Sequence, residues 1–143
     1  MEPAQPPREL TISYTHFNAM REHAIAGLPE EACGVLAGLD GRCLAVMPLT
    51  NALHSPTRYA VAPEELLRVF TTLEQNGWEL LAIFHSHPYG EAQPSATDRE
   101  TAYYPHSAYL ILAPLHGDWV CRAFLIDGKQ VSEIPLRVTA AGA

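Results

Sequence analysis

The chain has 143 residues, of which 48% are hydrophobic and 17% are charged, a composition typical of one globular domain rather than a disordered protein. The 9 basic and 16 acidic residues give a formal net charge of −7, which argues against binding to the phosphate backbone of nucleic acids. No apolar run approaches the length of a membrane span and the N-terminus lacks a secretory pattern, so we expect a cytoplasmic protein without nucleic-acid or membrane partners.

The N-terminal part of the chain is expected to form a tail, a short strand and a helix. Residues 1–9 contain three prolines and are expected to be a flexible tail, and residues 10–13 could form a short strand. The helix is expected to begin at an N-cap, either Ser13 or Thr15, and to end at Gly27. Its inner face is formed by apolar residues at helical spacing: Phe17, Met20 and Ala24.

A hairpin and a second helix are expected next. The apolar runs 32–39 and 43–49 are joined by an Asp-Gly pair, which is a strong hairpin signal. A polar loop and a short extended stretch over residues 50–61 lead to a helix that begins near Pro63 and is stopped by Asn76 and the glycine after it. The apolar positions of this helix follow a helical period: Leu66, Leu67, Phe70 and Leu73.

The second half of the chain is expected to add four strands and one short helix. The strands are 79–84, 109–113, 119–126 and an edge strand 131–136, and the helix covers about 95–101. We therefore expect one α+β domain over residues 10–136, in which helices pack on a mostly antiparallel sheet, and a C-terminal tail over residues 137–143.

Two histidines stand at the end of the apolar strand 79–84. His85 and His87 are two residues apart, so in a strand both imidazoles point to the same face and can reach one ion, while Ser86 turns away. Pro88 cannot continue central ladder pairing, so the strand ends where the histidines begin a site. A His-x-His pair alone also occurs as surface decoration or as a satisfied core pair.

A carboxylate completes a possible metal site. Asp98 follows His87 by eleven positions and shares a helical face with Ser95. Ser-x-x-Asp is also the pattern of a helix N-cap, a structural role that can coexist with function. Together, two histidines and one carboxylate make a three-ligand site that leaves the fourth tetrahedral position for water, as catalytic zinc requires.

The complete pattern resembles a known motif. The spacing H-x-H-P-x6-S-x2-D is similar to that of the JAMM (MPN+) metallopeptidase family, which also has a glutamate on an early strand before a Cys-Gly or similar pair. This chain matches at the following positions: Glu31 with Cys33 and Gly34, and His85, His87, Pro88, Ser95 and Asp98. Asn51 and Tyr59 also lie where bacterial relatives tend to have them, and the resemblance extends over residues 10–136.

The resemblance implies a fold, a metal and a set of roles. The fold would be a JAMM/MPN-type α+β domain with a mixed sheet in a three-layer arrangement similar to that of cytidine deaminases. His85, His87 and Asp98 would bind one Zn²⁺ per chain. Glu31 would take a proton from the attacking water and deliver it to the leaving amine, and Ser95 would donate a hydrogen bond to the oxyanion.

Glu30 is an alternative to Glu31 as the base, and the family register selects Glu31, with Glu30 as a solvated carboxylate. The three cysteines are widely spaced and contain no CxxC pair, which argues against a zinc ribbon or a disulfide framework. We interpret Cys33, Cys43 and Cys121 as buried apolar residues, although Cys33 lies only two residues from Glu31.

The remaining histidines and two tyrosines are given weaker interpretations. Three histidines in helix or turn contexts are expected at the surface: His16, His23 and His116. Two histidines in loops near the motif could line the cleft: His54 and His106. Tyr103 and Tyr104 are expected to pack around the motif helix.

The short loops favour one branch of the family. The segments 49–59 and 98–109 are too short for the insertions of specialised deubiquitinases. The chain is similar to the compact prokaryotic branch, which includes sulfur-carrier (CysO)-cysteine peptidases and desampylase-like enzymes. The implied partner is therefore a ubiquitin-like or sulfur-carrier protein that ends in Gly-Gly, and the implied reaction releases cysteine or a conjugated protein.

Two other relatives are considered. A RadC-type DNA-repair-associated protein also has H-x-H-P followed by a loop with Gly and Pro, which Gly90 and Pro94 match, but the Glu31 segment and the acidic charge favour the peptidase. A non-catalytic MPN scaffold domain usually lacks one or more ligands, whereas this chain has all three. The sequence does not predict the oligomeric state.

Overall fold

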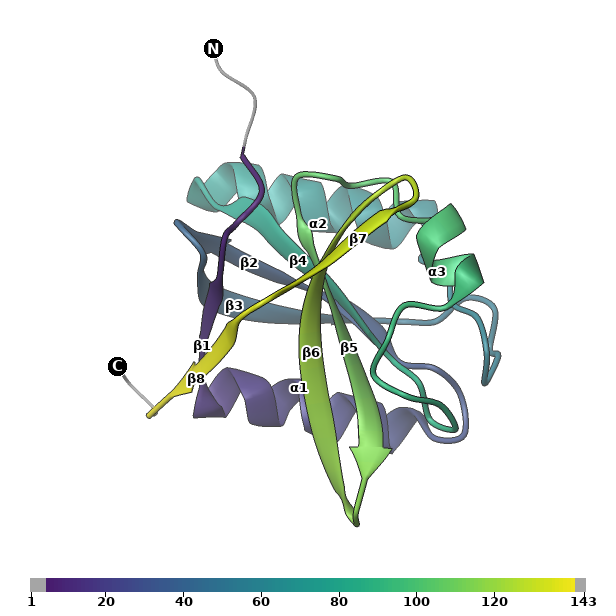
Figure 1. Cartoon of the computed structure of the whole chain (residues 1–143). Helices are drawn as coiled ribbons and strands as arrows, with labels where there is room; N and C mark the ends of the chain where they lie inside the picture. The colour runs from purple at the N-terminus through teal and green to yellow at the C-terminus, as the bar shows by residue number, and fades with distance from the viewer. Residues whose placement is uncertain (1–4, 141–143) are drawn as a thin grey trace.

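Residues 5–140 are described by the computed structural model, and within them eight strands form one mixed sheet accompanied by three helices (Figure 1). The strands are β1 (Leu10–Ser13), β2 (Cys33–Leu39), β3 (Arg42–Leu49), β4 (Glu79–Ser86), β5 (Ala108–Leu115), β6 (Asp118–Asp127), β7 (Gln130–Ile134) and β8 (Leu136–Thr139). The helices are α1 (Tyr14–Gly27), α2 (Pro63–Asn76) and α3 (Ala96–Glu100).

The sheet has the strand order β7-β6-β5-β4-β2-β3-β1-β8. The β4–β5, β1–β3 and β1–β8 pairs are parallel, and the other pairs are antiparallel, so the predicted mixed and mostly antiparallel sheet is confirmed. The predicted tails 1–9 and 137–143 lie partly outside the described residues, and β8 extends through three residues of the second one.

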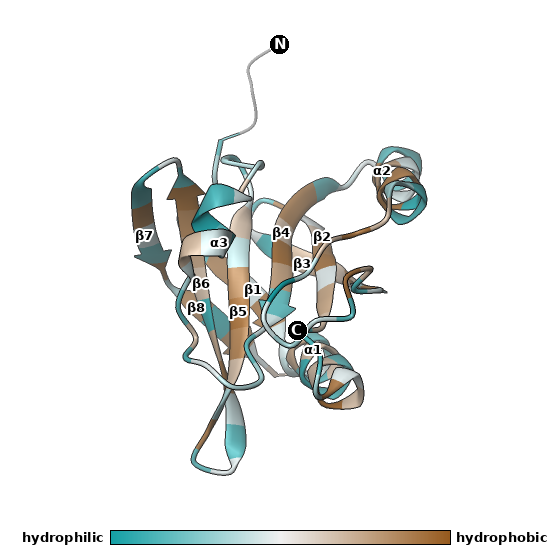
Figure 2. Ribbon diagram, turned by 90° about the vertical axis from the view of Figure 1, so that its right-hand side faces the viewer, coloured by the Kyte–Doolittle hydropathy of each residue, from teal (hydrophilic) through white to brown (hydrophobic). Residues whose placement is uncertain are grey.

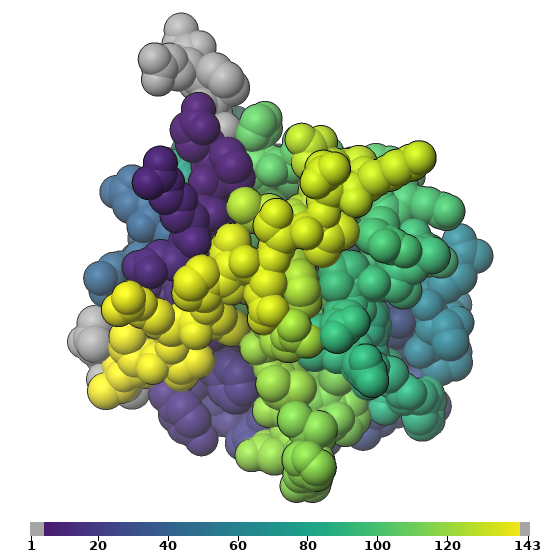
Figure 3. Space-filling view, viewed as in Figure 1, coloured from purple at the N-terminus to yellow at the C-terminus, as the bar shows by residue number. Residues whose placement is uncertain are grey.

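The C-terminal segment links the two edges of the sheet. β7 pairs with β6 at one edge, β8 pairs with β1 at the other, and only Pro135 separates them along the chain. The sequence predicted one edge strand over 131–136; the strand divides because proline has no N–H for the ladder, and the carbonyl of Pro135 instead accepts from Leu10 N at 3.0 Å. In Figure 3 this segment crosses the face as a continuous yellow band.

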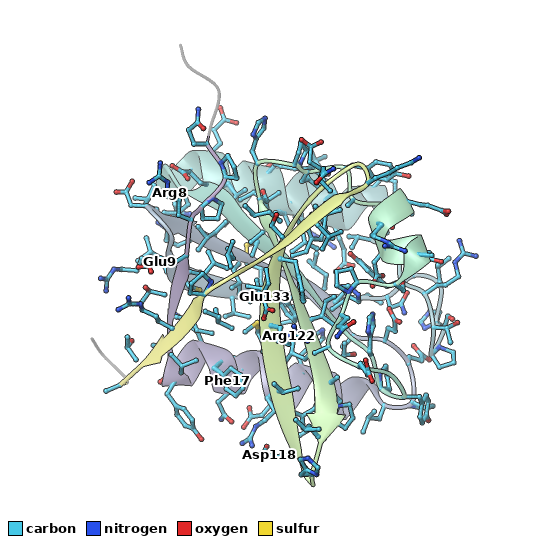
Figure 4. All side chains as sticks on the ribbon, viewed as in Figure 1. Arg8, Glu9, Phe17, Asp118, Arg122 and Glu133 are labelled. Atoms are coloured by element: carbon cyan, nitrogen blue, oxygen red, sulfur yellow. The ribbon has the colours of Figure 1, made fainter. Side chains whose placement is uncertain are left out.

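A cross-strand ion pair fastens β7 to β6. Arg122 donates to both carboxylate oxygens of Glu133, at 2.9 and 2.7 Å, and its guanidinium lies 5.4 Å from the centre of the Phe124 ring. Figure 4 shows Arg122 and Glu133 facing each other on the two strands. This two-pronged contact gives the exposed edge strand a fixed position beside β6.

Alternate residues of the central strands belong to two separate hydrophobic cores, one on each face of the sheet. Leu36 and Phe84 belong to a core that includes Met20 of α1, whereas Val35 and Ile83 belong to a core that includes Val69 and Leu73 of α2. The strands lie between the two helices in Figure 1, so the expected three-layer arrangement is confirmed. Because both faces are covered, β4 and β5 are coloured mainly as hydrophobic in Figure 2.

The inner face of α2 differs from the prediction. Of the predicted positions Leu73 is buried, whereas Leu67 is 68% exposed and Phe70 is 41% exposed; Val69, which was not among them, is buried beside Leu73. Both sets of residues fit a helical period, so the pattern alone could not choose the stripe that meets the sheet. Phe70 lies at the rim of the contact, where its ring is 6.3 Å from that of Tyr104.

The predicted Asp-Gly hairpin turn is confirmed by its backbone angles, and the turn between β5 and β6 has the same form. Asp40 and Gly41 have positive φ values of 53° and 75°, and His116 and Gly117 have 50° and 80°, as tight hairpin turns require. Among the described residues, no helix is both long and apolar enough to cross a membrane.

Candidate metal centre

The end of β4 directs two imidazoles to one point. His85 is 1% exposed, and its Nε2 lies 3.0 Å from Nε2 of His87. Ser86 points the other way, as predicted: its hydroxyl accepts a hydrogen bond from Ala32 N at 2.8 Å. His87 N donates to the carbonyl of Leu112 on β5 at 2.8 Å, which fixes the main chain beyond the end of the strand.

Helix α3 brings Asp98 to the same point. Its first turn is a capping box, in which the Ser95 hydroxyl accepts from Asp98 N at 3.0 Å and Asp98 Oδ2 accepts from Ser95 N at 2.9 Å. The same Oδ2 lies 3.1 Å from His85 Nε2 and 2.9 Å from His87 Nε2. The cap therefore orients the carboxylate toward the histidines and leaves the Ser95 hydroxyl proton free to donate.

The three converging atoms fit a metal ion. They lie 2.9 to 3.1 Å from one another, and the ligands of a tetrahedral zinc with bonds of about 2.0–2.1 Å lie about 3.3 Å apart. His87 Nδ1 lies 2.7 Å from the carbonyl oxygen of Glu91, to which it donates, so the lone pair of a neutral imidazole is on Nε2. The donor set and its geometry therefore match a metal site.

The protonation states of His85 and Asp98 also suit a cation. Burial lowers the pKa of His85, which keeps that imidazole neutral. Burial alone would raise the pKa of Asp98, but in the metal-free site hydrogen bonds with the two imidazoles and with Ser95 N hold it well below its usual range. Burial lowers the pKa of His87, but the hydrogen bond with Asp98 raises it overall, so a metal that binds His87 Nε2 displaces the proton shared with Asp98. A neutral imidazole and a carboxylate are the forms that bind a divalent metal.

Glu31 supplies a second, buried carboxyl. Ala32 pairs with Ser86 through two hydrogen bonds of 2.8 and 2.9 Å, which places Glu31 beside His87. Glu31 is 4% exposed, and within the described part of the chain its Oε1 has no hydrogen-bond partner. Burial raises its pKa to about 7, although the charge of His87 lowers it in part. Such a carboxyl can exchange a proton near neutral pH.

Glu30 has a different environment. Its carboxylate lies 3.1 Å from His54 Nδ1, and both side chains are substantially exposed. The structure therefore separates the two neighbouring glutamates, because only Glu31 is buried next to the converging ligands. His54 contacts Glu30 and is not among the converging residues.

An aromatic residue and an apolar groove adjoin the ligands. The Tyr59 ring stacks on the His85 ring, with centroids 4.6 Å apart and planes 25° apart. Tyr59 also lines a groove of about 380 Å³ between α2 and the loops around it. The groove includes the following side chains: Leu53, Leu66, Phe70, Tyr103 and Tyr104. Sequence reasoning gave Tyr59 no role, because no local pattern reveals a stacking partner 26 residues away.

Three predictions for the other histidines are wrong. His106 borders a separate cavity with Glu79 and Leu81, at the opposite end of β4 from His85, so it does not line the cleft. His23 is half-buried rather than a surface residue, and its Nε2 lies 3.0 Å from the carbonyl oxygens of Cys33 and Leu49. It therefore bridges β2 and β3, a long-range contact that its helical context does not reveal. His16 is also half-buried, whereas His116 is exposed as predicted.

The cysteines are structural. Burial raises the pKa of the Cys33 thiol to about 12, that of Cys43 to about 11 and that of Cys121 to about 12. Cys33 and Cys43 are buried and Cys121 is half-buried. Because the thiols remain protonated at neutral pH, Cys33 is no nucleophile despite its proximity to Glu31.

Comparisons with known proteins agree with this geometry. Residues 14–126 match the family described as prokaryotic homologs of the JAB domain. The chain is 38% identical over 133 residues to the CysO-cysteine peptidase of Mycobacterium tuberculosis, with 90% of each chain covered. It is 41% identical over 97 residues to a desampylase of Haloferax volcanii, which covers 66% of this chain and 70% of that enzyme.

A solved structure gives the same result for the fold. A Desulfitobacterium hafniense protein is 36% identical to this chain and similar in structure, with a TM-score of 0.83 over 92% of this chain and 93% of that one. The resemblance drawn from the motif and the predicted fold class are both confirmed. The chain therefore belongs to the prokaryotic branch of the JAB (JAMM/MPN) family and is a hydrolase of the JAMM type.

Proposed function

We propose that this protein is a zinc-dependent peptidase that cleaves the bond after the C-terminal Gly-Gly of a ubiquitin-like or sulfur-carrier protein, releasing cysteine or a conjugated protein. The observation that carries the proposal is the convergence of three ligand atoms within 3.1 Å beside the buried carboxyl of Glu31. The named relatives support the substrate class, since one is a CysO-cysteine peptidase and another a desampylase. A complete ligand set beside a buried carboxyl supports a catalytic site rather than a non-catalytic scaffold domain.

Three side chains would bind the metal. His85, His87 and Asp98 would bind zinc through Nε2, Nε2 and Oδ2, the three atoms that converge. When bound, zinc would supply a Lewis acid that polarises the scissile carbonyl and acidifies water. The hydrogen bond from His87 Nδ1 to the Glu91 carbonyl keeps the imidazole in the orientation that this requires.

Glu31 moves the proton. Its pKa of about 7 lets it accept a proton from the attacking water at neutral pH and then donate it to the leaving amine. The unpartnered Oε1 is consistent with this role, because a permanent donor to that oxygen would compete with the water. Ser95 would assist at the carbonyl oxygen: its hydroxyl accepts from Asp98 N, and its own proton remains available for the developing oxyanion.

The substrate would approach as an extended tail. A Gly-Gly terminus is the narrowest peptide, which suits a reaction at ligands buried as deeply as His85. We assign the apolar groove beside Tyr59 to the residues of the carrier that precede Gly-Gly, because the stacked Tyr59–His85 pair connects groove and ligands.

The test is a panel of ubiquitin-like carriers, each carrying a C-terminal cysteine or an isopeptide-linked protein, incubated with zinc-loaded enzyme and followed by mass spectrometry. We expect a mass change that corresponds to cleavage directly after Gly-Gly, and its loss when a chelator is added. Failure to process any member of the panel, or cleavage that persists without metal, would contradict the proposal. The member that is processed fastest identifies the leaving group.

A further inference from the structure

Asn51 is a buried side chain beside Glu31 that takes no part in the chemistry described so far. It is 6% exposed and lies at the start of the loop between β3 and α2. The two N–H groups of its Nδ2 donate to the main-chain carbonyl oxygens of Glu31 at 3.0 Å and Arg58 at 2.9 Å, and one of them is shared with that of Ser55 at 3.3 Å. Its Oδ1 accepts from two main-chain N–H groups: those of Leu53 at 3.0 Å and Ala60 at 3.3 Å.

These contacts hold the Glu31 main chain from one side. Glu31 N donates to the Ser55 carbonyl at 2.8 Å, and the Glu31 carbonyl accepts from Asn51. The other side is held by β4, because Ala32 exchanges two hydrogen bonds with Ser86, the residue between the two histidine ligands. The Glu31 main chain is thus fixed between the β3–α2 loop and β4, the strand that carries His85.

The carboxyl itself lacks such support. Glu31 Oε1 is buried without a hydrogen-bond partner among residues 5–140. A carboxyl in this state favours rotation toward water, since burial of an unpaired polar group is costly. A side-chain donor could hold it, but a hydrogen bond to the charged form would also make it a weaker base. The Glu31 carboxyl can therefore be kept beside the metal ligands by hydrogen bonds that restrain the main chain of Glu31.

We propose that Asn51 is the positioning residue of the base, and that its amide binds the Glu31 main chain and the Tyr59 loop into one unit beside the metal ligands. The two residues that flank Tyr59, Arg58 and Ala60, both bond to the Asn51 amide, and the Tyr59 ring stacks on His85. The Asn51 side chain therefore positions both Glu31 and the Tyr59 ring that packs against the ligand His85. This inference rests on the proposed role of Glu31 as the base.

The first test compares Asn51→Ala with Ser107→Ala. The Ser107 hydroxyl is a matched control, because it also makes a buried hydrogen bond to a main-chain carbonyl, that of Leu80 at 2.7 Å, but at the far end of β4. Asn51→Ala should keep zinc and lower kcat by roughly 10- to 100-fold, more than it changes KM, because a base displaced by about 1 Å loses most of its rate. Ser107→Ala should lower Tm and leave kcat unchanged. A zinc-loaded Asn51→Ala protein with wild-type kcat would overturn the proposal.

The second test needs no substrate. Asn51→Asp keeps the oxygen that accepts from Leu53 and Ala60 but loses every N–H donated toward Glu31, and it serves if the alanine variant does not fold. Amide hydrogen exchange by NMR should become at least about 10-fold faster at Glu31, while the Ala32 amide, held by Ser86, stays protected. Unchanged exchange at Glu31 would overturn the proposal. If wild-type protein cleaves no carrier, the proposed function fails, and this measurement still decides how Glu31 is placed.

Discussion

Histidine and carboxylate side chains lie at both ends of β4, yet only one end has the arrangement of a metal centre. At the start of the strand, His106 and Glu79 are exposed around a cavity of about 400 Å³. At its end, His85, His87 and Asp98 bring their ligand atoms within 3.1 Å of one another beside a groove of about 380 Å³. The volumes are nearly equal, so convergence and burial of the polar atoms distinguish the two ends.

The free-energy cost of burying polar atoms explains why the difference between the two ends of β4 is informative. Glu31 Oε1 and His85 Nδ1 are both buried without a hydrogen-bond partner in the described part of the chain, and each such group destabilises the fold. His16 Nδ1 and Arg21 Nε on α1 are buried in the same way, so the lack of a partner points to chemistry only where it coincides with the converging ligand atoms. Substitutions at the His85 end of β4, paired with controls away from it, therefore test whether only this end binds metal.

Removal of a ligand should have the largest effect. His87→Ala or Asp98→Ala takes away one of three converging atoms, so zinc content should fall from about one per chain to background and turnover should cease. His106→Ala, at the other end of β4, is the matched control and should keep its zinc. Elemental analysis of the purified proteins gives the result, and equal zinc in all of them would contradict the assignment.

Substitution of Glu31, the proposed base, should have the next largest effect. Glu31→Gln keeps the shape of the side chain but cannot accept the proton, so kcat should fall by roughly 10²- to 10⁴-fold while zinc is retained. Glu30→Gln should leave kcat unchanged, because that carboxylate pairs with His54 at the surface. Steady-state kinetics on the cleaved carrier decides between them. A normal rate for Glu31→Gln together with a loss for Glu30→Gln would show that the base is the other glutamate.

Ser95→Ala should have a smaller effect on turnover. It removes one donor to the oxyanion, which typically lowers kcat by roughly 10²- to 10³-fold, and it also removes the cap of α3, worth about 1 kcal/mol of stability. Ser13→Ala is the matched control, because the Ser13 hydroxyl caps α1 in the same way and accepts from His16 N at 3.1 Å. If the two variants lose stability and rate to the same extent, Ser95 acts only as a cap.

The smallest effect concerns stability in the absence of metal. The pKa of Glu31 is raised from 4.5 to about 7 in the fold, so the folded state holds a proton that the unfolded chain releases, and stability should fall as pH rises through this window. Above pH 7 the metal-free Glu31→Gln protein should be more stable than wild type by about 2–3 kcal/mol, and near pH 4.5 by almost nothing. Denaturant unfolding at both pH values is the measurement; a variant less stable than wild type at pH 8 would contradict the burial argument.

Local patterns in the sequence predicted the parts of the site that depend on a single element. The alternation of a strand places His85 and His87 on one face, and the capping pattern of a short helix places Asp98 near Ser95. The hairpin at Asp40 was predictable for the same reason, because the turn residues alone specify it.

Contacts between distant segments could not be predicted in this way. β8 pairs with β1 across more than 120 residues, and Asn51 reaches Glu31 across 20. His106 is close to the motif along the chain but at the far end of β4 in space, because the chain returns to the start of β5 after α3. The stripe of α2 that meets the sheet was likewise set by packing rather than by its period.

The most direct test of the account is anomalous X-ray diffraction from zinc-loaded crystals, with data collected on both sides of the zinc absorption edge. We expect one anomalous peak per chain at the end of β4, within about 2.0–2.2 Å of His85 Nε2, His87 Nε2 and Asp98 Oδ2. No peak at these three atoms, or a zinc bound at His106 instead, would contradict it.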